Sequence, residues 1–147
     1  GFIVSSKENI EFLRQRSRNY IFSNSLSPAI TAVTSFVIDY IKKNSETRKA
    51  LWKNVRQFRQ KMKKVGFEIS RQEHPIVPIM LGDAKIAKEM ARELFKEGIY
   101  VVAFSYPVVP EGKARVRVQI SAAHTKKDIN GAVQAFTKIG KKIGYLN

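Results

Sequence analysis

The spacing of hydrophobic residues changes from a helical period to a strand period near residue 66. Upstream, apolar residues three or four positions apart predict a one-faced amphipathic helix over residues 45–65. Downstream, short apolar runs predict strands, and two longer helical patterns separate and follow them. The predicted strands cover residues 67–70, 76–81, 99–104 and 114–120, and the helices cover residues 83–97 and 125–143. This order predicts the α+β class, with a small, mostly antiparallel sheet and helices on one of its faces.

The first 43 residues have a different pattern, in which one helix is apolar nearly all round. A strand end is predicted over residues 1–6 and an arginine-rich helix over residues 8–18. Ser27 and Pro28 suit the N-cap and first position of a further helix that ends near residue 43. Its apolar residues are Ile30, Val33, Phe36, Val37, Ile38, Tyr40 and Ile41. Because such a helix is typically buried on several sides, we expect further chain or a partner subunit to cover it.

Two predicted strands carry information about their place in the sheet. The run of residues 99–104 is continuously apolar, which predicts a central strand buried on both faces. Pro78 lacks a backbone donor, so it predicts an edge position or a bulge for residues 76–81.

Two arginines on the last predicted strand are a candidate for binding chemistry. Residues 114–120 alternate, so that Arg115 and Arg117 share one face and Val116 and Val118 share the other. A guanidinium group can bind a carboxylate or a phosphate through two parallel hydrogen bonds. The simpler alternative is a pair of solvated or salt-bridged arginines, and spacing alone favours it.

Other polar segments are weaker candidates. Ser23, Asn24 and Ser25 precede a helix start, where backbone N–H groups and hydroxyls suit a phosphate, but spacing alone favours an N-cap turn. The proline-containing loop at residues 105–112 could close over a ligand or simply turn the chain.

We interpret His124 as a capping or packing residue. With two histidines and no cysteine in the chain, we expect no metal site.

Composition limits the class of protein. The chain has 147 residues, of which 44% are hydrophobic, so it can form a core and is not a disordered segment. The net charge of +15 allows a nucleic-acid-binding module, but the basic residues are dispersed over polar helix faces with few aromatic residues among them. No apolar run approaches the roughly 18 residues of a membrane span. We therefore expect a soluble, cytoplasmic protein, and the absence of an initiator methionine favours a piece of a longer one.

Four segments together resemble a known enzyme family. They are residues 14–28, 74–83, 104–110 and 112–125, in this order along the chain. The resemblance is to the α-oxoamine synthases, a branch of the fold-type-I pyridoxal-phosphate (PLP) enzymes, which have an α/β architecture. The Phe-Ser-Asn-Ser-Leu and Gln-Ile-Ser-Ala-Ala-His stretches are most similar to the glycine C-acetyltransferase branch, also called the 2-amino-3-ketobutyrate coenzyme A ligases. The alternative is another branch, such as the 8-amino-7-oxononanoate synthases.

The resemblance implies an activity and roles for particular residues. The family branch joins glycine and acetyl-CoA reversibly to give 2-amino-3-ketobutyrate and CoA, in threonine and glycine metabolism, as a homodimer. Ser23 and Asn24 match positions that bind the PLP phosphate of the partner subunit. Arg117 matches the arginine that holds the amino-acid carboxylate, with Arg115 in support. Residues 106–110 match a mobile segment near the substrates, and Asn19 departs from the proline often found there.

The resemblance also implies that part of the enzyme is not in this chain. The lysine that holds PLP as a Schiff base, the stacking histidine and the acidic partner of the pyridine ring match positions upstream of Gly1. We therefore expect residues 1–27 to be a remnant of the large PLP-binding domain, residues 28–65 to be interdomain helices, and residues 66–147 to be the small C-terminal domain. No catalytic residue is assigned within the chain, and we expect it alone to bind no PLP and to be inactive.

Two hypotheses from other classes stay open at this point. One is a basic α+β module that binds nucleic acid, which would need the net positive charge to be presented with exposed aromatic rings. The other is a non-catalytic dimerisation module built on the apolar helix of residues 28–43. The family resemblance predicts no specific nucleic-acid partner and no membrane partner.

Overall fold

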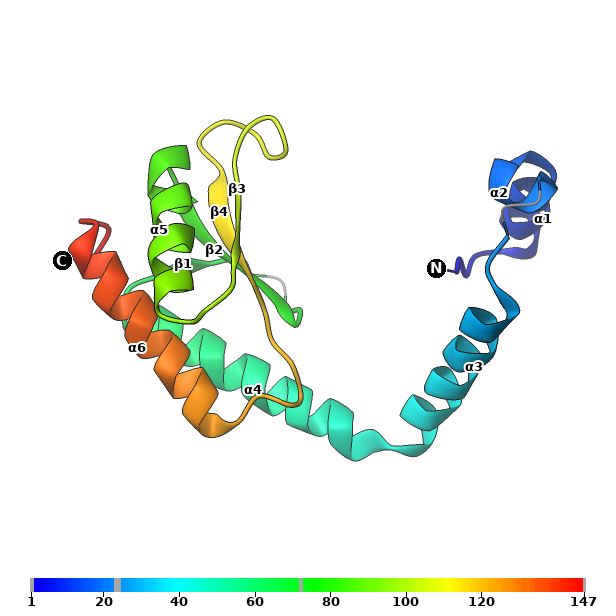
Figure 1. The fold of residues 1–147 in the computed structure, drawn as a ribbon, viewed down its shortest axis with the longest axis horizontal. Coiled ribbons are helices and arrows are strands. Elements are labelled where there is room, and N and C mark those ends of the chain that lie inside the picture. The colour runs from blue at the N-terminus through cyan, green and yellow to red at the C-terminus, as the bar shows by residue number, and fades with distance from the viewer. Residues whose placement is uncertain (1, 23–24, 72, 147) are drawn as a thin grey trace. The chain divides into compact units, whose positions relative to one another are not determined.

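The computed structural model describes residues 2–22, 25–71 and 73–146. The chain divides into two compact units, Gly1–Lys43 and Asn44–Asn147 (Figure 1). The boundary puts the helix of residues 45–64 in the same unit as the sheet. The division at residues 27 and 65 that the family resemblance implies stays a prediction.

The first unit consists of helices. They are α1 (Lys7–Arg16), α2 (Arg18–Ile21) and α3 (Pro28–Lys43). Ser6 begins α1, where its hydroxyl accepts a hydrogen bond from the Asn9 N–H at 3.4 Å, and Arg14 and Arg16 in its last turn complement the helix dipole. The predicted strand at residues 1–6 was wrong for the described residues 2–6, which lie outside any strand.

Helix α3 exposes the apolar residues that the sequence pattern singled out. None of its residues is buried, and Phe36 and Val33 are 69% and 61% exposed. All seven of the large apolar side chains named above are among the exposed hydrophobic residues of the chain. An apolar surface of this extent on a helix is typical of a surface that another chain segment or subunit covers.

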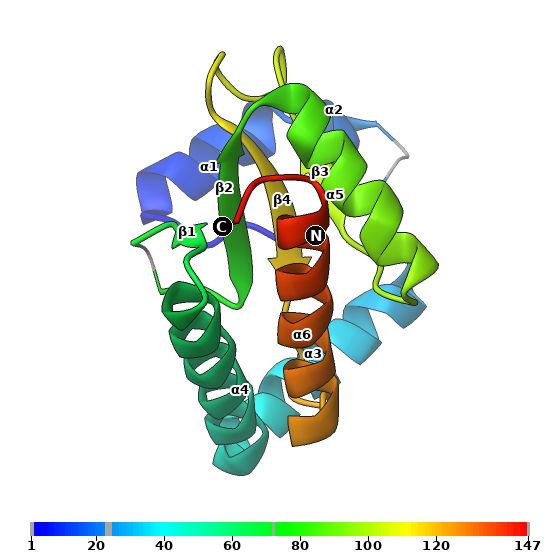
Figure 2. The ribbon, with the colours of Figure 1, turned by 90° about the vertical axis from the view of Figure 1, so that its left-hand side faces the viewer.

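The second unit is a four-stranded antiparallel sheet with three helices. The strands are β1 (Glu68–Ile69), β2 (Ile76–Gly82), β3 (Val102–Phe104) and β4 (Ala114–Gln119), in the spatial order β1-β2-β4-β3. The helices are α4 (Ser45–Lys64), α5 (Ala84–Lys96) and α6 (Lys126–Lys142), and they lie on one face of the sheet (Figure 2). This arrangement confirms the predicted α+β layer.

The core lies between the sheet and the three helices. Alternate strand residues, among them Val77, Ile79 and Val116, are fully buried against helix residues such as Met90. Three phenylalanine rings from different parts of the chain meet edge to face: the Phe136 ring centroid lies 6.2 Å from that of Phe58 and 5.8 Å from that of Phe67. Apolar residues thus alternate along the strands because only one sheet face packs on helices.

The predicted central strand at residues 99–104 was wrong in its position. Only Val102–Phe104 pair with β4, and β3 is an edge strand. The run is apolar for another reason: Val101 is 8% exposed and Ile99 packs against the core from outside the ladder, whereas Tyr100 is 79% exposed. Residues 99–101 are thus apolar because two of them pack against the core, and not because they pair within the sheet. The two kinds of burial produce the same apolar run in the sequence.

Pro78 lies in an interior strand, although its missing donor predicted an edge or a bulge. The Ile120 N–H donates to the Pro75 carbonyl at 2.9 Å, so alternation along the ladder turns the backbone of Pro78 away from β4, toward β1. The β1 strand has only two residues, and at its end the Ser70 N–H donates weakly to the Pro78 carbonyl at 3.5 Å. Pro78 therefore removes no bond from the β2–β4 ladder. The register shift in β2 lies between Met80 and Gly82 instead.

Side-chain caps fix the starts of two helices. The Asp83 carboxylate accepts hydrogen bonds from the N–H groups of Lys85 and Ile86 at 2.7 and 2.9 Å. Thr125 and Asp128 form a reciprocal capping box at the start of α6. The pKa of Asp128 is lowered because its carboxylate accepts hydrogen bonds from the Thr125 backbone and hydroxyl. These caps set where α5 and α6 begin after the strands.

A buried carboxylate joins α5 to α6. The Glu93 side chain is 8% exposed, and its two oxygens accept from Lys142 at 2.5 Å and from Lys96 at 2.6 Å. These two ammonium groups, Lys142 first, lower the pKa of Glu93 to about 2. The bond to Lys142 crosses between helices that are separated by two strands in the sequence.

We predict that Glu93 makes the second unit sensitive to acid. Because its pKa is lower in the folded state, its contribution to stability is full above its unfolded pKa of about 4.5 and falls as the pH approaches 2. Urea unfolding followed by the fluorescence of Trp52, the single tryptophan, measures this. The unfolding free energy of the unchanged chain should drop more between pH 5 and pH 2.5 than that of Glu93→Gln. Glu89→Gln is the matched control, since its half-exposed carboxylate pairs with Arg92 and with no other described residue. Equal drops in the unchanged chain and Glu93→Gln would refute the role of Glu93.

Two glycines in α6 provide a test of the packing at the C-terminal end. A Cβ on Gly140 would lie 2.9 Å from both the Leu146 side chain and the Phe67 ring, whereas one on Gly131 meets no atom within 4 Å. We expect Gly140→Ala to destabilise the unit by about 1–3 kcal/mol through overpacking. Gly131→Ala should stabilise it by up to about 1 kcal/mol through helix propensity. Thermal unfolding followed by circular dichroism compares the two variants, and equal melting temperatures would contradict the close packing of Leu146 on α6.

Candidate functional site

One face of the sheet carries no helix of the second unit, and we call it the open face. Residues paired directly across antiparallel strands lie on the same face, so the register defines its rows. The rows through the two arginines are Pro78–Arg117–Val102, across three strands, and Glu68–Met80–Arg115–Phe104, across all four. The structure thus places both candidate arginines on the open face, as the alternation of β4 predicts, with apolar residues on either side of each.

Arg117 has an uncommitted guanidinium group. Its side chain is exposed, and its Cζ atom lies over the Phe104 ring, 4.7 Å from the centroid. No described carboxylate forms an ion pair with it. The N–H donors of this cation are therefore available to a ligand. In the alternative, a salt-bridged arginine, a carboxylate of the chain would occupy them.

Arg115 differs from its neighbour. It is half-buried, and its Nε–H donates to the Lys113 carbonyl at 3.1 Å. Part of its hydrogen-bonding capacity is thus used to hold the chain just before β4. Of the two arginines, Arg117 is the better ligand-binding candidate, and Arg115 is suited to a supporting role.

The loop between β3 and β4 starts directly after Phe104. It turns through hydrogen bonds from the Val108 and Val109 N–H groups to the Ser105 carbonyl, at 3.0 and 3.3 Å, and contains a cis peptide bond before Pro107. Tyr106, the second residue of the loop, is 67% exposed. The loop borders a small hollow lined by Gly82, Asp83, Ala84, Ser105, Tyr106, Pro110, Glu111, Gly112 and Ala114.

Ser23 and Asn24, the predicted cofactor-phosphate residues, lie outside the described residues. Downstream of them α3 begins at Pro28, and the Thr31 N–H donates to the Ser27 carbonyl at 3.1 Å. No Asp or Glu occurs from residue 12 to residue 38, a stretch that contains three arginines. Hydroxyl and amide donors in a cationic segment before a helix suit a phosphate group, so the residue types present fit the phosphate of PLP.

The sequence matches the family model of class I and II aminotransferases over residues 1–136. The chain belongs to this family. Membership of this family accounts for the fold. A separate nucleic-acid-binding module is not needed to explain it.

Curated members of the family resemble the chain along nearly all its length. The 2-amino-3-ketobutyrate coenzyme A ligase of Escherichia coli (strain K12) is 54% identical over 146 residues, which are 99% of this chain and 37% of that protein. The 8-amino-7-oxononanoate synthase of Thermosipho melanesiensis is 45% identical, with the same coverage of both chains. The chain therefore spans 37% of the length of these relatives.

A solved family structure confirms the predicted fold class. Serine palmitoyltransferase from S. paucimobilis, determined with a bound PLP–myriocin adduct, superposes with a TM-score of 0.87 at 31% identity. The match covers 97% of this chain and 36% of that one. The helices and the antiparallel sheet thus match the C-terminal part of a fold-type-I PLP enzyme. The individual roles of Arg117, Ser23 and Asn24 stay predictions.

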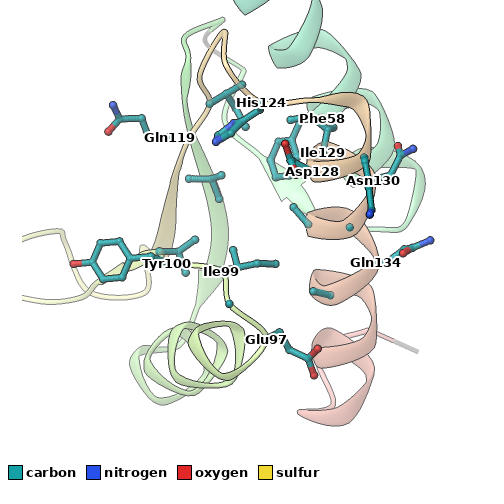
Figure 3. A pocket seen from close by; sticks show the side chains of 18 of the residues that line it. Phe58, Glu97, Ile99, Tyr100, Gln119, His124, Asp128, Ile129, Asn130 and Gln134 are labelled. Atoms are coloured by element: carbon teal, nitrogen blue, oxygen red, sulfur yellow. The ribbon is translucent and has the colours of Figure 1, made fainter.

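A hollow of the second unit lies at the sheet edge, beside β4 (Figure 3). The β3–β4 pairing ends at Val102–Arg117, so β4 has no partner on this side at Gln119. The gap reaches the start of α6, where His124, Asp128 and Asn130 line it. Figure 3 shows Tyr100 and Gln119 pointing away from α6. Arg117 lies in its wall, and the mixed charges of the lining assign no particular chemistry to it.

Both histidines serve local backbone turns. The His74 Nδ1 accepts from the Ile76 N–H at 3.0 Å, and the His124 Nδ1 accepts from the Ser121 N–H at 3.2 Å. The buried Asn54 side chain holds the second turn by donating to the carbonyls of Ser121 and His124 at 3.1 and 2.8 Å. The His124 bond lies in the turn before α6 and does not cap that helix, whose N-cap is Thr125. Within the described ranges, no three His, Cys, Asp or Glu residues gather as metal ligands, and no helix is long and apolar enough to span a membrane.

The open face does not favour the nucleic-acid alternative. Across the described residues of its strands it presents one aromatic ring, that of Phe104, and Arg117 lies over this ring. A sheet that stacks bases would need several uncovered rings on adjacent strands. Phe104 is also the residue that the sequence analysis missed. Position 104 falls opposite Arg115 and diagonal to Arg117 only in the observed register of β3 with β4, which no local pattern of the sequence specifies.

Proposed function

We propose that the chain is the C-terminal part of a PLP-dependent acyltransferase that condenses glycine with acetyl-CoA to give 2-amino-3-ketobutyrate and CoA. The reaction is reversible and belongs to glycine and threonine metabolism in the cytoplasm. Identity of 54% over 146 residues with the E. coli ligase supports this branch of the family. The observation that carries the proposal is the free guanidinium of Arg117 on the open face.

In this proposal Arg117 binds the carboxylate of glycine. A guanidinium pairs with a carboxylate through two parallel charge-assisted hydrogen bonds, which fix both the position and the plane of the acid. Glycine has no side chain to contact, so its carboxylate is the group by which a protein can orient it. Arg115, half-buried and bonded to the Lys113 carbonyl, maintains the local strand geometry and adds positive potential.

Ser23 and Asn24 would hold the phosphate of PLP, which supplies an electron sink for the glycine α-carbon when it is bound. In the family these two residues serve the active site of the partner subunit. The exposed loop at residues 106–110, which begins two residues after Phe104, would cover the substrates. The role of the protein in this proposal is to orient and to neutralise charge.

The proposal includes a homodimer. The seven exposed apolar residues of α3, among them Phe36 at 69% exposure, form a surface that a second subunit or the preceding part of the enzyme would cover. The dimerisation hypothesis thus becomes part of this proposal: α3 would contribute to the dimer interface of an enzyme subunit.

A second candidate within the family is an 8-amino-7-oxononanoate synthase. The relative from Thermosipho melanesiensis supports it, because it is 45% identical over the same length. The higher identity to the E. coli ligase favours glycine C-acetyltransfer. Product analysis separates the two candidates, since their products differ.

We predict that the 147-residue chain alone will not catalyse the reaction. No lysine in it matches the cofactor-binding lysine of the family. The purified chain is mixed with PLP, glycine and acetyl-CoA, and CoA release is followed with a thiol reagent. We expect the rate of the blank without protein. Turnover above this blank would contradict the expectation that the chain lacks catalytic residues.

We further predict that Arg117 governs the affinity for glycine in a complete enzyme. The matching 37% of the E. coli ligase is replaced by this chain, and the chimera is assayed with glycine and acetyl-CoA. Arg117→Lys loses the bidentate fork, so the KM for glycine should rise about tenfold or more while that for acetyl-CoA stays constant. Arg92→Lys, on the exposed side of α5, is the matched control. An inactive chimera, or an unchanged glycine KM in Arg117→Lys, would overturn the proposal.

A further inference from the structure

The two arginines of the open face are held by different means. Arg115 is tied to the main chain through the Lys113 carbonyl. The Arg117 guanidinium makes no hydrogen bond to any described residue, and its one directional contact is with the Phe104 ring. An exposed arginine with no such contact would sample many rotamers, and a ligand that fixes it would pay an entropic cost.

Strand register determines the contact between Phe104 and Arg117. Val102 is opposite Arg117 and Phe104 is opposite Arg115, so Phe104 and Arg117 are diagonal neighbours on one face. Diagonal residues of an antiparallel pair are within reach when both side chains are long or aromatic. The distance of 4.7 Å from the Arg117 Cζ to the ring centroid is within the range of a cation–π contact.

We propose that Phe104 is a positioning residue for Arg117: its ring holds the guanidinium over the open face in the orientation that receives the amino-acid carboxylate. This inference rests on the proposed function, in which Arg117 binds glycine. A cation–π contact uses the π-face of the ring and leaves the N–H donors of the guanidinium unused. The cation is thus restrained without losing the hydrogen bonds that a carboxylate needs.

The surroundings of the pair favour this role over an incidental contact. Pro78 and Val102 occupy the paired positions on either side of Arg117, so its aliphatic stem runs between apolar residues. Phe104 is half-buried and lies immediately before the 105–113 loop. Because the described residues offer Arg117 no carboxylate, the ring is the contact that restrains it without competing with a substrate.

The first test examines the geometry in the chain itself. An aromatic ring shifts the resonances of protons above its face upfield, so the Arg117 Nε–H signal in a ¹H–¹⁵N spectrum reports the contact. We expect this signal upfield of the other arginines, and Phe104→Leu should return it to the common position. Tyr100→Leu is the matched control, since that exposed ring packs on Phe95 and not on an arginine. A wild-type Arg117 signal at the common position would overturn the proposal.

The second test measures the consequence for the substrate in the chimera described above. Phe104→Leu should raise the KM for glycine by about two- to fivefold, the size of an exposed cation–π contact. The kcat and the KM for acetyl-CoA should stay constant, which a general loss of structure would not produce. Phe104→Tyr keeps a π-face and should restore the wild-type KM. Unfolding followed by Trp52 fluorescence verifies that each variant folds.

The outcomes separate this inference from the proposed function. If Arg117→Lys raises the glycine KM and Phe104→Leu does not, the positioning role is refuted and the carboxylate role of Arg117 stands. If neither variant changes the glycine KM, both are refuted. A rise of glycine KM in Phe104→Leu that Phe104→Tyr fails to restore also refutes the cation–π basis of positioning.

Discussion

The antiparallel pairing of β2 with β4 depends on burying one face of each strand. Val77 and Ile79 on β2 pair with Val118 and Val116 on β4, and three of these four side chains have no exposed surface. A slip of one residue in β2 would turn Val77 and Ile79 to solvent. The same slip in β4 would turn its valines to solvent and its arginines toward the helices. The desolvation of a guanidinium without a partner makes that alternative costly. The position of Arg117 is therefore a consequence of core packing.

The helices secure this register from outside the sheet. Phe58 of α4 and Phe136 of α6 meet over the strands, and Glu93 of α5 binds Lys142 of α6 across the layer. Each contact joins segments far apart in the chain. Packing of the helices on one face of the sheet thus determines which side chains, Arg117 among them, lie on the open face. The first unit contrasts with this, because none of the described residues in its three helices is buried.

The net charge of +15 has a different meaning in the structure than in the composition. Several lysines form ion pairs with Glu46, Glu93 or Glu97 at helix surfaces. Arg117 is distinct because it lies on a sheet face, over an aromatic ring and without a described carboxylate partner. In the proposed function the ligand of this cation is a small acid, the carboxylate of glycine, and not a nucleic-acid backbone.

The sequence by itself determined the helices of the second unit, the α+β layer and the face shared by Arg115 and Arg117, because periodicity acts over a few positions. It also contained the motifs that resemble the α-oxoamine synthases. Only the tertiary structure decided that β3 is an edge strand, since packing on helices and pairing within a sheet make the same apolar run over residues 99–104. It likewise decided that Phe104 contacts Arg117. Two residues 13 positions apart meet there through a strand register that no local pattern specifies.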